Sequence, residues 1–157
     1  MSKSRAVTAV LGEPPYVVTL SDGRHEWLGD EPVESGGGDR GPTPHQLVLS
    51  GLGACTAITL RMYAARKGWA LAGVTVELQL NPDGAPEGGG SEVRRRITLR
   101  GDLTDGQRER LLQVADACPV NKTLGGAIHT TTTLVRRIAK RTFVGCAAGS
   151  PRNITSW

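Results

Sequence analysis

One segment constrains the fold of this chain more than any other: a long apolar helix predicted between residues 43 and 68. Thr43-Pro44-His45-Gln46 has the form of a capping box, with a hydroxyl N-cap, proline at the first helical position and glutamine three residues after the cap. Gly68 supplies a C-terminal stop, so the helix takes about 24 residues. Its first two thirds are apolar nearly all round. We therefore expect a central, buried helix, which another backbone can approach closely at the small residues Ser50, Gly51, Gly53 and Ala54.

Alternation of apolar and polar residues predicts strands on both sides of this helix. Residues 7–28 predict one or two strands in a hairpin or meander, and residues 30–42 predict a surface loop. After the helix, residues 74–80 and 93–99 alternate and predict a hairpin around a glycine-rich loop. Arg95 breaks this pattern, because it falls on the apolar face of its strand.

The last third of the chain predicts a second helix and a further strand. Thr104-Asp-Gly-Gln107 is a second capping box, and Pro119 interrupts the helix that follows it. Residues 121–126 suggest a short helix or turn, and residues 127–138 a threonine-rich strand. The order is therefore β-β, α, β-β, α, β, in one domain over residues 1–142 that is followed by a tail over 143–157. The buried stripe of the second helix is expected to consist of Leu111, Leu112, Ala115 and Cys118.

Length and hydropathy narrow the class of protein. A chain of 157 residues with 38% hydrophobic content is enough for one domain with a single core. The longest weakly polar run, Leu47 to Leu60, has 14 residues, whereas a helix that crosses a bilayer takes about 20. The first residues contain no apolar signal segment. We expect no membrane association and a cytoplasmic location.

The charge of the chain is positive and unevenly distributed. The formal net charge is +4, no acidic residue follows Asp116, and Arg94, Arg95 and Arg96 are consecutive. These groups could face an anionic partner or form a solvated strand edge. With three Trp, two Tyr and one Phe there are few platforms on which bases could stack. Since no nucleic-acid-binding motif is present either, we expect no nucleic-acid partner.

The three cysteines suggest redox chemistry more than structural roles. Cys55, Cys118 and Cys146 are an odd number in a chain without an export signal, which argues against a disulfide framework. Their spacing fits no metal site, and we expect neither metal nor cofactor. Cys55 alone could be an inert buried thiol. Two helices that each direct a cysteine to the core, however, are what a peroxidatic and resolving pair requires. Cys146 is expected to be a bystander.

Two motifs around these cysteines carry a resemblance to a known family. Leu49-Ser-Gly-Leu-Gly-Ala-Cys55-Thr, after Gly41-Pro-Thr-Pro44, and Asp116-Ala-Cys118-Pro-Val-Asn-Lys-Thr-Leu124 resemble the cysteine motifs of the OsmC/Ohr family, named for osmotically inducible protein C and organic hydroperoxide resistance. The resemblance covers most of residues 7–138. It implies an OsmC-like α+β fold, in which two subunits intertwine mixed or antiparallel sheets around paired central helices. The active sites then lie at the interface of a homodimer.

The resemblance also implies an activity. Cys55 would attack an organic hydroperoxide and become a sulfenic acid, which condenses with Cys118; a dithiol or thiol protein then reduces the disulfide. This is a thiol-dependent peroxidase of the oxidative stress response that needs no cofactor. A function of another class stays open: a non-catalytic dimer that binds a small hydrophobic ligand in the interface cleft.

The sequence departs from the family at the groups that activate the thiol. A cysteine at neutral pH needs a nearby cation to form much thiolate. In the hydroperoxide-reducing members this cation is an arginine of the first hairpin, held by a glutamate nine or ten residues before the cysteine. Here those positions hold His45 and Gln46, and Gly12-Glu-Pro-Pro15 occupies the arginine's place. We expect Arg95 as first choice and Arg24 as second to replace it, with Gln46 holding the guanidinium; Arg61 is a third candidate. Arg95 could equally pair with a carboxylate.

Overall fold

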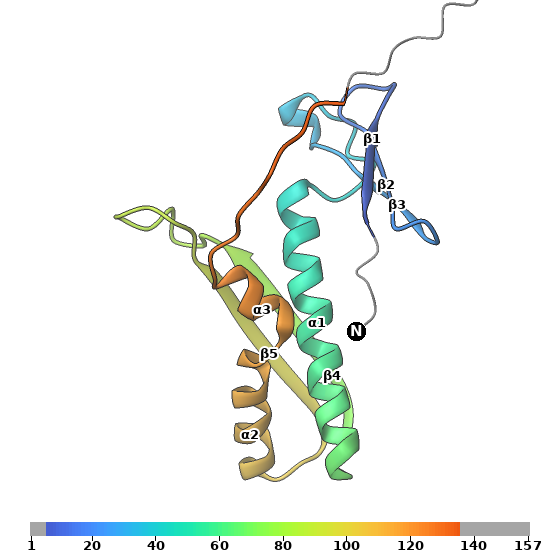
Figure 1. Ribbon diagram of the computed structural model, residues 1–157. Coiled ribbons are helices and arrows are strands. Elements are labelled where there is room, and N and C mark those ends of the chain that lie inside the picture. Colours follow the sequence, from blue (N-terminus) through green and yellow to red (C-terminus); the bar gives the residue numbers. More distant parts are fainter. Residues whose placement is uncertain (1–5, 136–157) are drawn as a thin grey trace, which may run out of the picture.

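The computed structural model describes residues 6–135 and has the α+β class expected from the sequence (Figure 1). It contains two antiparallel sheets, one of three strands and one of two. The strands are β1 (Thr8–Leu11), β2 (Val18–Ser21), β3 (Glu26–Gly29), β4 (Ala70–Leu80) and β5 (Val93–Asp102). The helices are the short 3-10 helix η1 (Val33–Ser35), α1 (Pro44–Lys67), α2 (Asp105–Asp116) and α3 (Pro119–Leu124).

The long helix α1 begins and ends where its caps predict. The Gln46 backbone N–H donates to the Thr43 hydroxyl over 3.3 Å, and the Thr43 N–H donates to the Gln46 side-chain oxygen over 2.9 Å. Gly68 ends the helix in the left-handed conformation, with a φ of 66°, which glycine adopts without a steric penalty. The predicted capping box and glycine stop are both confirmed.

The core lies where α1 and α2 pack against the β4–β5 hairpin. Leu60, Ala64, Leu71 and Leu111 form its centre and are almost completely buried. The buried stripe of α2 differs in one position from the prediction. Leu112 is 51% exposed, and Val114 takes its place beside Leu111 and Ala115, because a helix turns by about 100° per residue. Cys118, just after α2, is buried as expected.

The N-terminal segment forms a three-stranded meander rather than one or two strands. β2 pairs with β1 on one side and with β3 on the other. The sequence did not reveal β3 because Glu26-Trp-Leu-Gly29 does not alternate between apolar and polar residues. Figure 1 shows this sheet at the N-terminal end of α1, on the far side from α2.

A buried carboxylate organises the loop between β3 and α1. Asp30 is only 2% exposed and accepts backbone N–H groups from Glu31 at 2.8 Å, Gly38 at 3.1 Å and Arg40 at 3.0 Å. The Arg40 N–H is the main reason that the pKa of Asp30 lies below its ordinary value. Burial opposes the shift, and the N–H groups of Glu31 and Gly38 add to it. The loop that leads into α1 is therefore held by one ionised side chain.

We expect Asp30→Asn to lower the melting temperature at neutral pH, because an amide offers these donors a weaker acceptor. The pKa of Asp30 is lower in the folded than in the unfolded chain, so its stabilising contribution is complete above about pH 4. It is lost as the pH falls through the folded-state pKa. In thermal melts from pH 7 to 2, the difference between wild type and variant should shrink below pH 4. A difference that grows on acidification would contradict this account.

The predicted threonine-rich strand is wrong for the residues that the structure describes. Residues 127–135 form no strand and run as an extended segment from α3 toward the three-stranded sheet (Figure 1). A strand needs an edge to pair with, and no described strand pairs with this segment. Residues 136–138 of the predicted strand, the expected tail over 143–157 and Cys146 lie outside the described residues.

The expectation that α1 is buried on all sides is not met by the part of the chain that the structure describes. Its buried residues, Leu52, Thr56, Leu60 and Ala64, form a single stripe, because the β4–β5 hairpin, α2 and α3 cover only part of the helix surface. By length and composition α1 could cross a membrane, contrary to the expectation from the sequence. Its most apolar 18-residue window has a mean hydropathy of 1.4, and 22% of that window is buried. The core helix of a water-soluble protein can satisfy the same criteria.

Candidate functional site

Two cysteines that are 63 positions apart in the sequence meet at the contact between α1 and the α2–α3 junction. Cys55 lies near the middle of α1 and is half-buried, whereas Cys118 precedes α3 and is completely buried. Both thiols are free, and a hydrogen bond joins the Cys55 side chain to Cys118. The fold thus places one accessible and one sheltered sulfur side by side.

The surroundings of Cys118 favour its thiolate. Burial raises the pKa of the thiol, but hydrogen bonds to the sulfur act in the opposite direction and prevail. They come from the Cys55 thiol, the Asn121 backbone, the Thr56 hydroxyl and the Val120 backbone. The pKa of Cys118 is therefore lower than that of an ordinary cysteine, so its sulfur is more readily ionised.

Arg95 lies on the inner face of β5, as its place in the alternation predicts, and its side chain is only 14% exposed. One nitrogen, Nη1, donates to the Thr56 hydroxyl over 3.3 Å and to the Ala115 carbonyl over 3.2 Å. The other, Nη2, donates to Asp116 Oδ1 over 2.6 Å. Arg95 therefore contacts the residue after Cys55 and the segment just before Cys118. Its ion pair with a carboxylate is the alternative that the sequence had left open.

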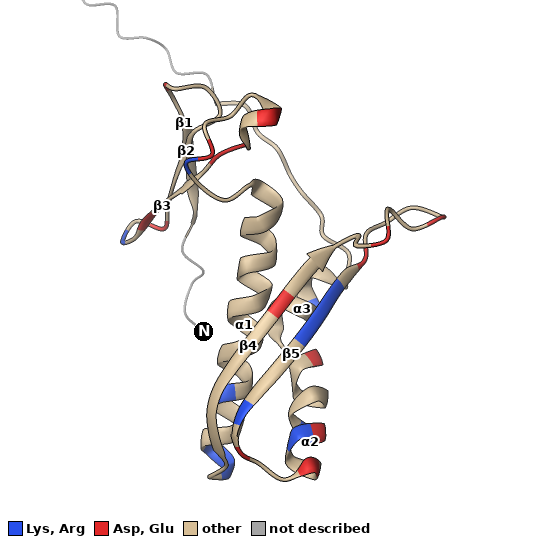
Figure 2. Ribbon diagram, turned by 180° about the vertical axis from the view of Figure 1, so that it is seen from behind, with Lys and Arg blue, Asp and Glu red and all other residues tan. Residues whose placement is uncertain are grey.

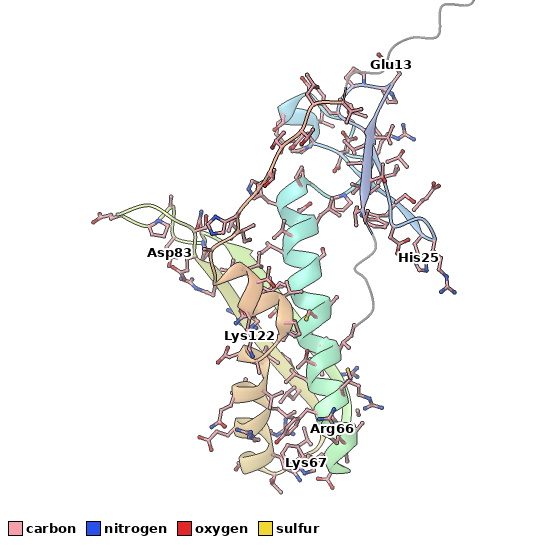
Figure 3. The ribbon with its side chains drawn as sticks, in the orientation of Figure 1. Glu13, His25, Arg66, Lys67, Asp83 and Lys122 are labelled. Atoms are coloured by element: carbon pink, nitrogen blue, oxygen red, sulfur yellow. The ribbon has the colours of Figure 1, made fainter. Side chains whose placement is uncertain are left out.

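The other arginines and the start of α1 lie apart from this cluster. Arg24 is exposed in the β2–β3 turn, where its N–H donates to Asp22 over 2.9 Å. Figure 3 shows its neighbour His25 at the outer end of that hairpin, away from the side of α1 that faces α3. Arg61 donates to the Leu71 carbonyl. His45 is exposed, and the Gln46 side-chain oxygen caps α1. Within one chain these residues are not brought to the cysteines.

Cys55 belongs to a face of α1 that the other residues between 6 and 135 leave uncovered. Small and apolar residues recur on it at alternating spacings of three and four, the pattern of a helix that packs along another helix. The large members are more than half exposed: 51% for Val48, 59% for Ile58 and 58% for Met62. The face consists of Val48, Gly51, Cys55, Ile58, Met62 and Ala65.

A groove of about 560 Å³ lies between α1 and β4, lined by Gly53, Ala57, Val76 and Leu78 among others. At about 100° per residue, Gly53 is about 200° around the helix from Cys55, so the two lie on opposite sides of α1. This groove is therefore a separate feature from the cysteine pair.

The two arginines next to Arg95, Arg94 and Arg96, lie on the outer face of the β4–β5 hairpin. Arg94 pairs with Asp83 and Glu92, and Arg96 lies 3.7 Å from Glu77. Figure 2 shows basic residues along β5 and an acidic residue on β4 beside them. These exposed ion pairs support the interpretation of the basic cluster as a solvated strand edge.

Sequence reasoning missed two members of the cluster, Thr56 and Asp116. Thr56 lies four residues after Leu52 and four before Leu60, on the one buried stripe of α1. A buried hydroxyl needs a hydrogen-bond partner. The presence of a threonine on an otherwise apolar stripe was therefore the signal that could have pointed to Thr56. Asp116 is 75% exposed, and its place two residues before Cys118 in the second motif is the one signal that could have pointed to it.

Comparison with known proteins identifies the family. Residues 36–133 match the sequence profile of the OsmC-like protein family. The structure of an OsmC-like protein from Mycoplasma pneumoniae is similar with a TM-score of 0.66 and 23% identity, covering 80% of this chain and 90% of that one. None of the proteins with curated descriptions matches the sequence.

Two further solved structures have names that concern hydroperoxides. An organic hydroperoxide resistance protein OsmC from Legionella pneumophila, also described as a predicted redox protein and regulator of sulfide bond formation, has a TM-score of 0.57 and 25% identity over 80% of this chain and 92% of its own. A candidate organic hydroperoxide resistance protein from Vibrio cholerae, with captopril in one of its active sites, has a TM-score of 0.55 and 26% identity, over 80% and 88%. Since the family profile covers more than half of its residues, the chain belongs to the OsmC-like family.

Proposed function

We propose that the protein is a thiol-dependent peroxidase that reduces organic hydroperoxides. The observation that carries this proposal is the pairing of an accessible cysteine, Cys55, with a buried cysteine of lowered pKa, Cys118, on separate elements. Membership of the OsmC-like family supports the proposal, as does the similarity to a hydroperoxide resistance protein.

The proposed cycle needs only the two sulfurs, a hydroperoxide and a dithiol. The Cys55 thiolate attacks the peroxide, so that a sulfur–oxygen bond forms, the oxygen–oxygen bond breaks and the alkoxide leaves as an alcohol after taking a proton. The Cys118 thiolate then attacks the sulfenic sulfur and forms a disulfide, while the hydroxide that leaves takes a proton and becomes water. A dithiol or thiol protein reduces the disulfide by exchange and restores both thiols.

We propose further that the protein acts as a homodimer in the cytoplasm, in which a second copy covers the face of α1 that carries Cys55. Apolar side chains exposed at 3-4 spacing on a long helix favour a second helix as partner. A partner subunit is also a route by which Arg24, His45 or Gln46 could approach Cys55. The site would then be complete only in the dimer.

Organic hydroperoxides should be consumed faster than hydrogen peroxide when a dithiol is supplied. Val48, Ile58 and Met62 lie on the same face of α1 as Cys55, and an apolar surface beside the thiol favours an alkyl group over a small polar oxidant. The measurement is the initial rate of loss of cumene hydroperoxide, tert-butyl hydroperoxide and hydrogen peroxide at equal concentrations. Equal or reversed rates would contradict the role of this apolar face.

The α1–β4 groove favours a second candidate, a non-catalytic protein that binds a small hydrophobic ligand. The same assay separates the two functions, because a binding protein consumes no hydroperoxide at any dithiol concentration. If no turnover is observed, the binding function becomes the better account.

A further inference from the structure

Thr56 connects the guanidinium of Arg95 to the buried sulfur of Cys118. Arg95 Nη1 lies 3.3 Å from the Thr56 hydroxyl oxygen. Because a guanidinium can only donate, the hydroxyl oxygen accepts this bond and its own proton remains available for another acceptor. The Cys118 sulfur is the acceptor toward which this proton can point, because the Thr56 side chain is among the donors that lower the pKa of Cys118.

The position of Thr56 in the helix supports this orientation of its hydroxyl. Serine and threonine in helices often donate to the carbonyl one turn earlier, as Ser50 does to Gln46 over 2.7 Å. Among the described residues, Thr56 makes no such bond within α1, although its side chain is completely buried. Its hydroxyl instead reaches across to β5 and the α2–α3 junction.

Asp116 holds the other end of the same chain of hydrogen bonds. It accepts from Arg95 Nη2 at 2.6 Å, while Arg95 Nη1 also donates to the Ala115 carbonyl at 3.2 Å. That carbonyl accepts the Cys118 backbone N–H at 3.3 Å as well. Two bonds to neighbouring residues therefore fix the guanidinium against the segment that carries Cys118.

The geometry points to Thr56 and Asp116 as positioning residues for the resolving half of the reaction: Asp116 orients Arg95, and Arg95 orients the Thr56 hydroxyl so that its proton faces the Cys118 sulfur. The inference rests on the proposed function for the reaction it serves. A hydroxyl that donates to this sulfur stabilises the thiolate that attacks the Cys55 sulfenic acid. In that step the sulfur–sulfur bond forms, the sulfur–oxygen bond breaks and the released hydroxide becomes water by taking a proton.

Among residues 6–135, the titratable and charged groups around Cys118 come from four elements. Cys55 lies on α1, Arg95 on β5 and Asp116 at the end of α2, while Lys122 on α3 is exposed. Arg95 and Asp116 are paired with each other, so the group that passes their influence to the sulfur is the neutral hydroxyl of Thr56. Thr56 is consequently the residue to change first.

The first test measures the ionisation of Cys118 directly and needs no peroxide. In a full-length Cys55→Ser, Cys146→Ser background, thiolate absorbance at 240 nm reports Cys118 after subtraction of the titration of a variant in which Cys118 is also serine. Adding Thr56→Val should raise the apparent pKa by about one unit, because one hydrogen bond to a charged group is lost. Thr56→Ser keeps the hydroxyl and should restore the original value.

The effect of removing the Asp116 carboxylate can be compared with that of removing a carboxylate on the other face of the β4–β5 hairpin. Asp116→Asn should raise the pKa of Cys118 by less than Thr56→Val does, since it acts through two intermediate residues. Glu77→Gln removes the carboxylate of the comparable Arg96 pair and should leave the pKa unchanged. Circular dichroism of each variant checks that the fold is retained.

The second test measures the reaction step. With both catalytic thiols present, stopped-flow mixing with one equivalent of cumene hydroperoxide resolves sulfenic acid formation from disulfide formation. At a pH below the pKa of Cys118, Thr56→Val should slow disulfide formation by at least about threefold. A pKa raised by about one unit lowers the thiolate fraction of Cys118 about tenfold. The loss in rate is smaller than this, because a more basic thiolate is also a better nucleophile. Sulfenic acid formation should keep its rate, and Thr56→Ser should restore disulfide formation.

The outcomes separate this inference from the proposed function. An unchanged Cys118 pKa in folded Thr56→Val overturns the positioning role, even if the protein reduces hydroperoxides rapidly. A raised pKa together with slower disulfide formation supports it. If Thr56→Val raises the pKa of Cys118 but the protein consumes no hydroperoxide, the positioning role of Thr56 is supported and the proposed peroxidase function is contradicted.

Discussion

Cys55→Ser should reduce hydroperoxide consumption by at least about 10³-fold, because a serine hydroxyl is not ionised at neutral pH and cannot supply the sulfur that accepts the peroxide oxygen. The measurement is the steady-state rate with cumene hydroperoxide and excess dithiol, compared with wild type at the same protein concentration. Residual activity near that of wild type would show that another group carries the reaction.

Cys118→Ser should have a different effect from Cys55→Ser. Without added dithiol, it leaves Cys55 able to react with one equivalent of hydroperoxide, after which the chain stops as a sulfenic acid, because Cys118 is the thiol that would close the disulfide. A sulfenic acid probe such as dimedone should then label Cys55. Cys146→Ser is the control that removes a thiol outside the proposed pair, and it should change neither the rate nor the labelling.

Ile58→Asp should weaken self-association by at least about 100-fold. Ile58 is 59% exposed in the single chain, and in the proposed dimer it would be covered by the second copy. A carboxylate buried there without a partner costs several kcal/mol, and each 1.4 kcal/mol is a factor of ten in the dissociation constant. Sedimentation equilibrium gives the constants of both proteins.

Wild type should behave as a particle of twice the 16.6 kDa chain mass at micromolar concentration. Thr75→Asp is the control, because it adds the same charge on the exposed side of β4, away from the face that carries Cys55. A wild-type protein that sediments as a single chain would rule out the homodimer.

The parts of the fold that local chemistry determines could be predicted from the sequence. The bounds of α1 follow from a capping box and a left-handed glycine, and the β4–β5 hairpin follows from its alternation. The inward direction of Arg95 was also predictable, because a strand places alternate residues on one face. β3 and the conformation of residues 127–135 were not predictable in this way, because each depends on which edge is available for pairing.

The candidate site was predictable in its two sulfurs and in Arg95, but not in the residues that join them. Cys55 and Cys118 stand out by their motifs, but the residues that join them to Arg95 are set by how α1, β5 and α2 pack together. Thr56 and Asp116 bind the same guanidinium, that of Arg95, and are 60 positions apart in sequence. Contacts over such separations leave no periodic signal in one sequence, so their roles emerge only from the structure.

The most direct test of the peroxidase is to identify the bond that a single equivalent of hydroperoxide creates. The reduced full-length protein is treated with one equivalent of cumene hydroperoxide, its remaining thiols are blocked, and the digest is analysed by mass spectrometry without reduction. We expect one disulfide, between Cys55 and Cys118, with Cys146 recovered as a blocked thiol. Recovery of both Cys55 and Cys118 as unoxidised thiols, or a disulfide that contains Cys146, would contradict the proposed mechanism.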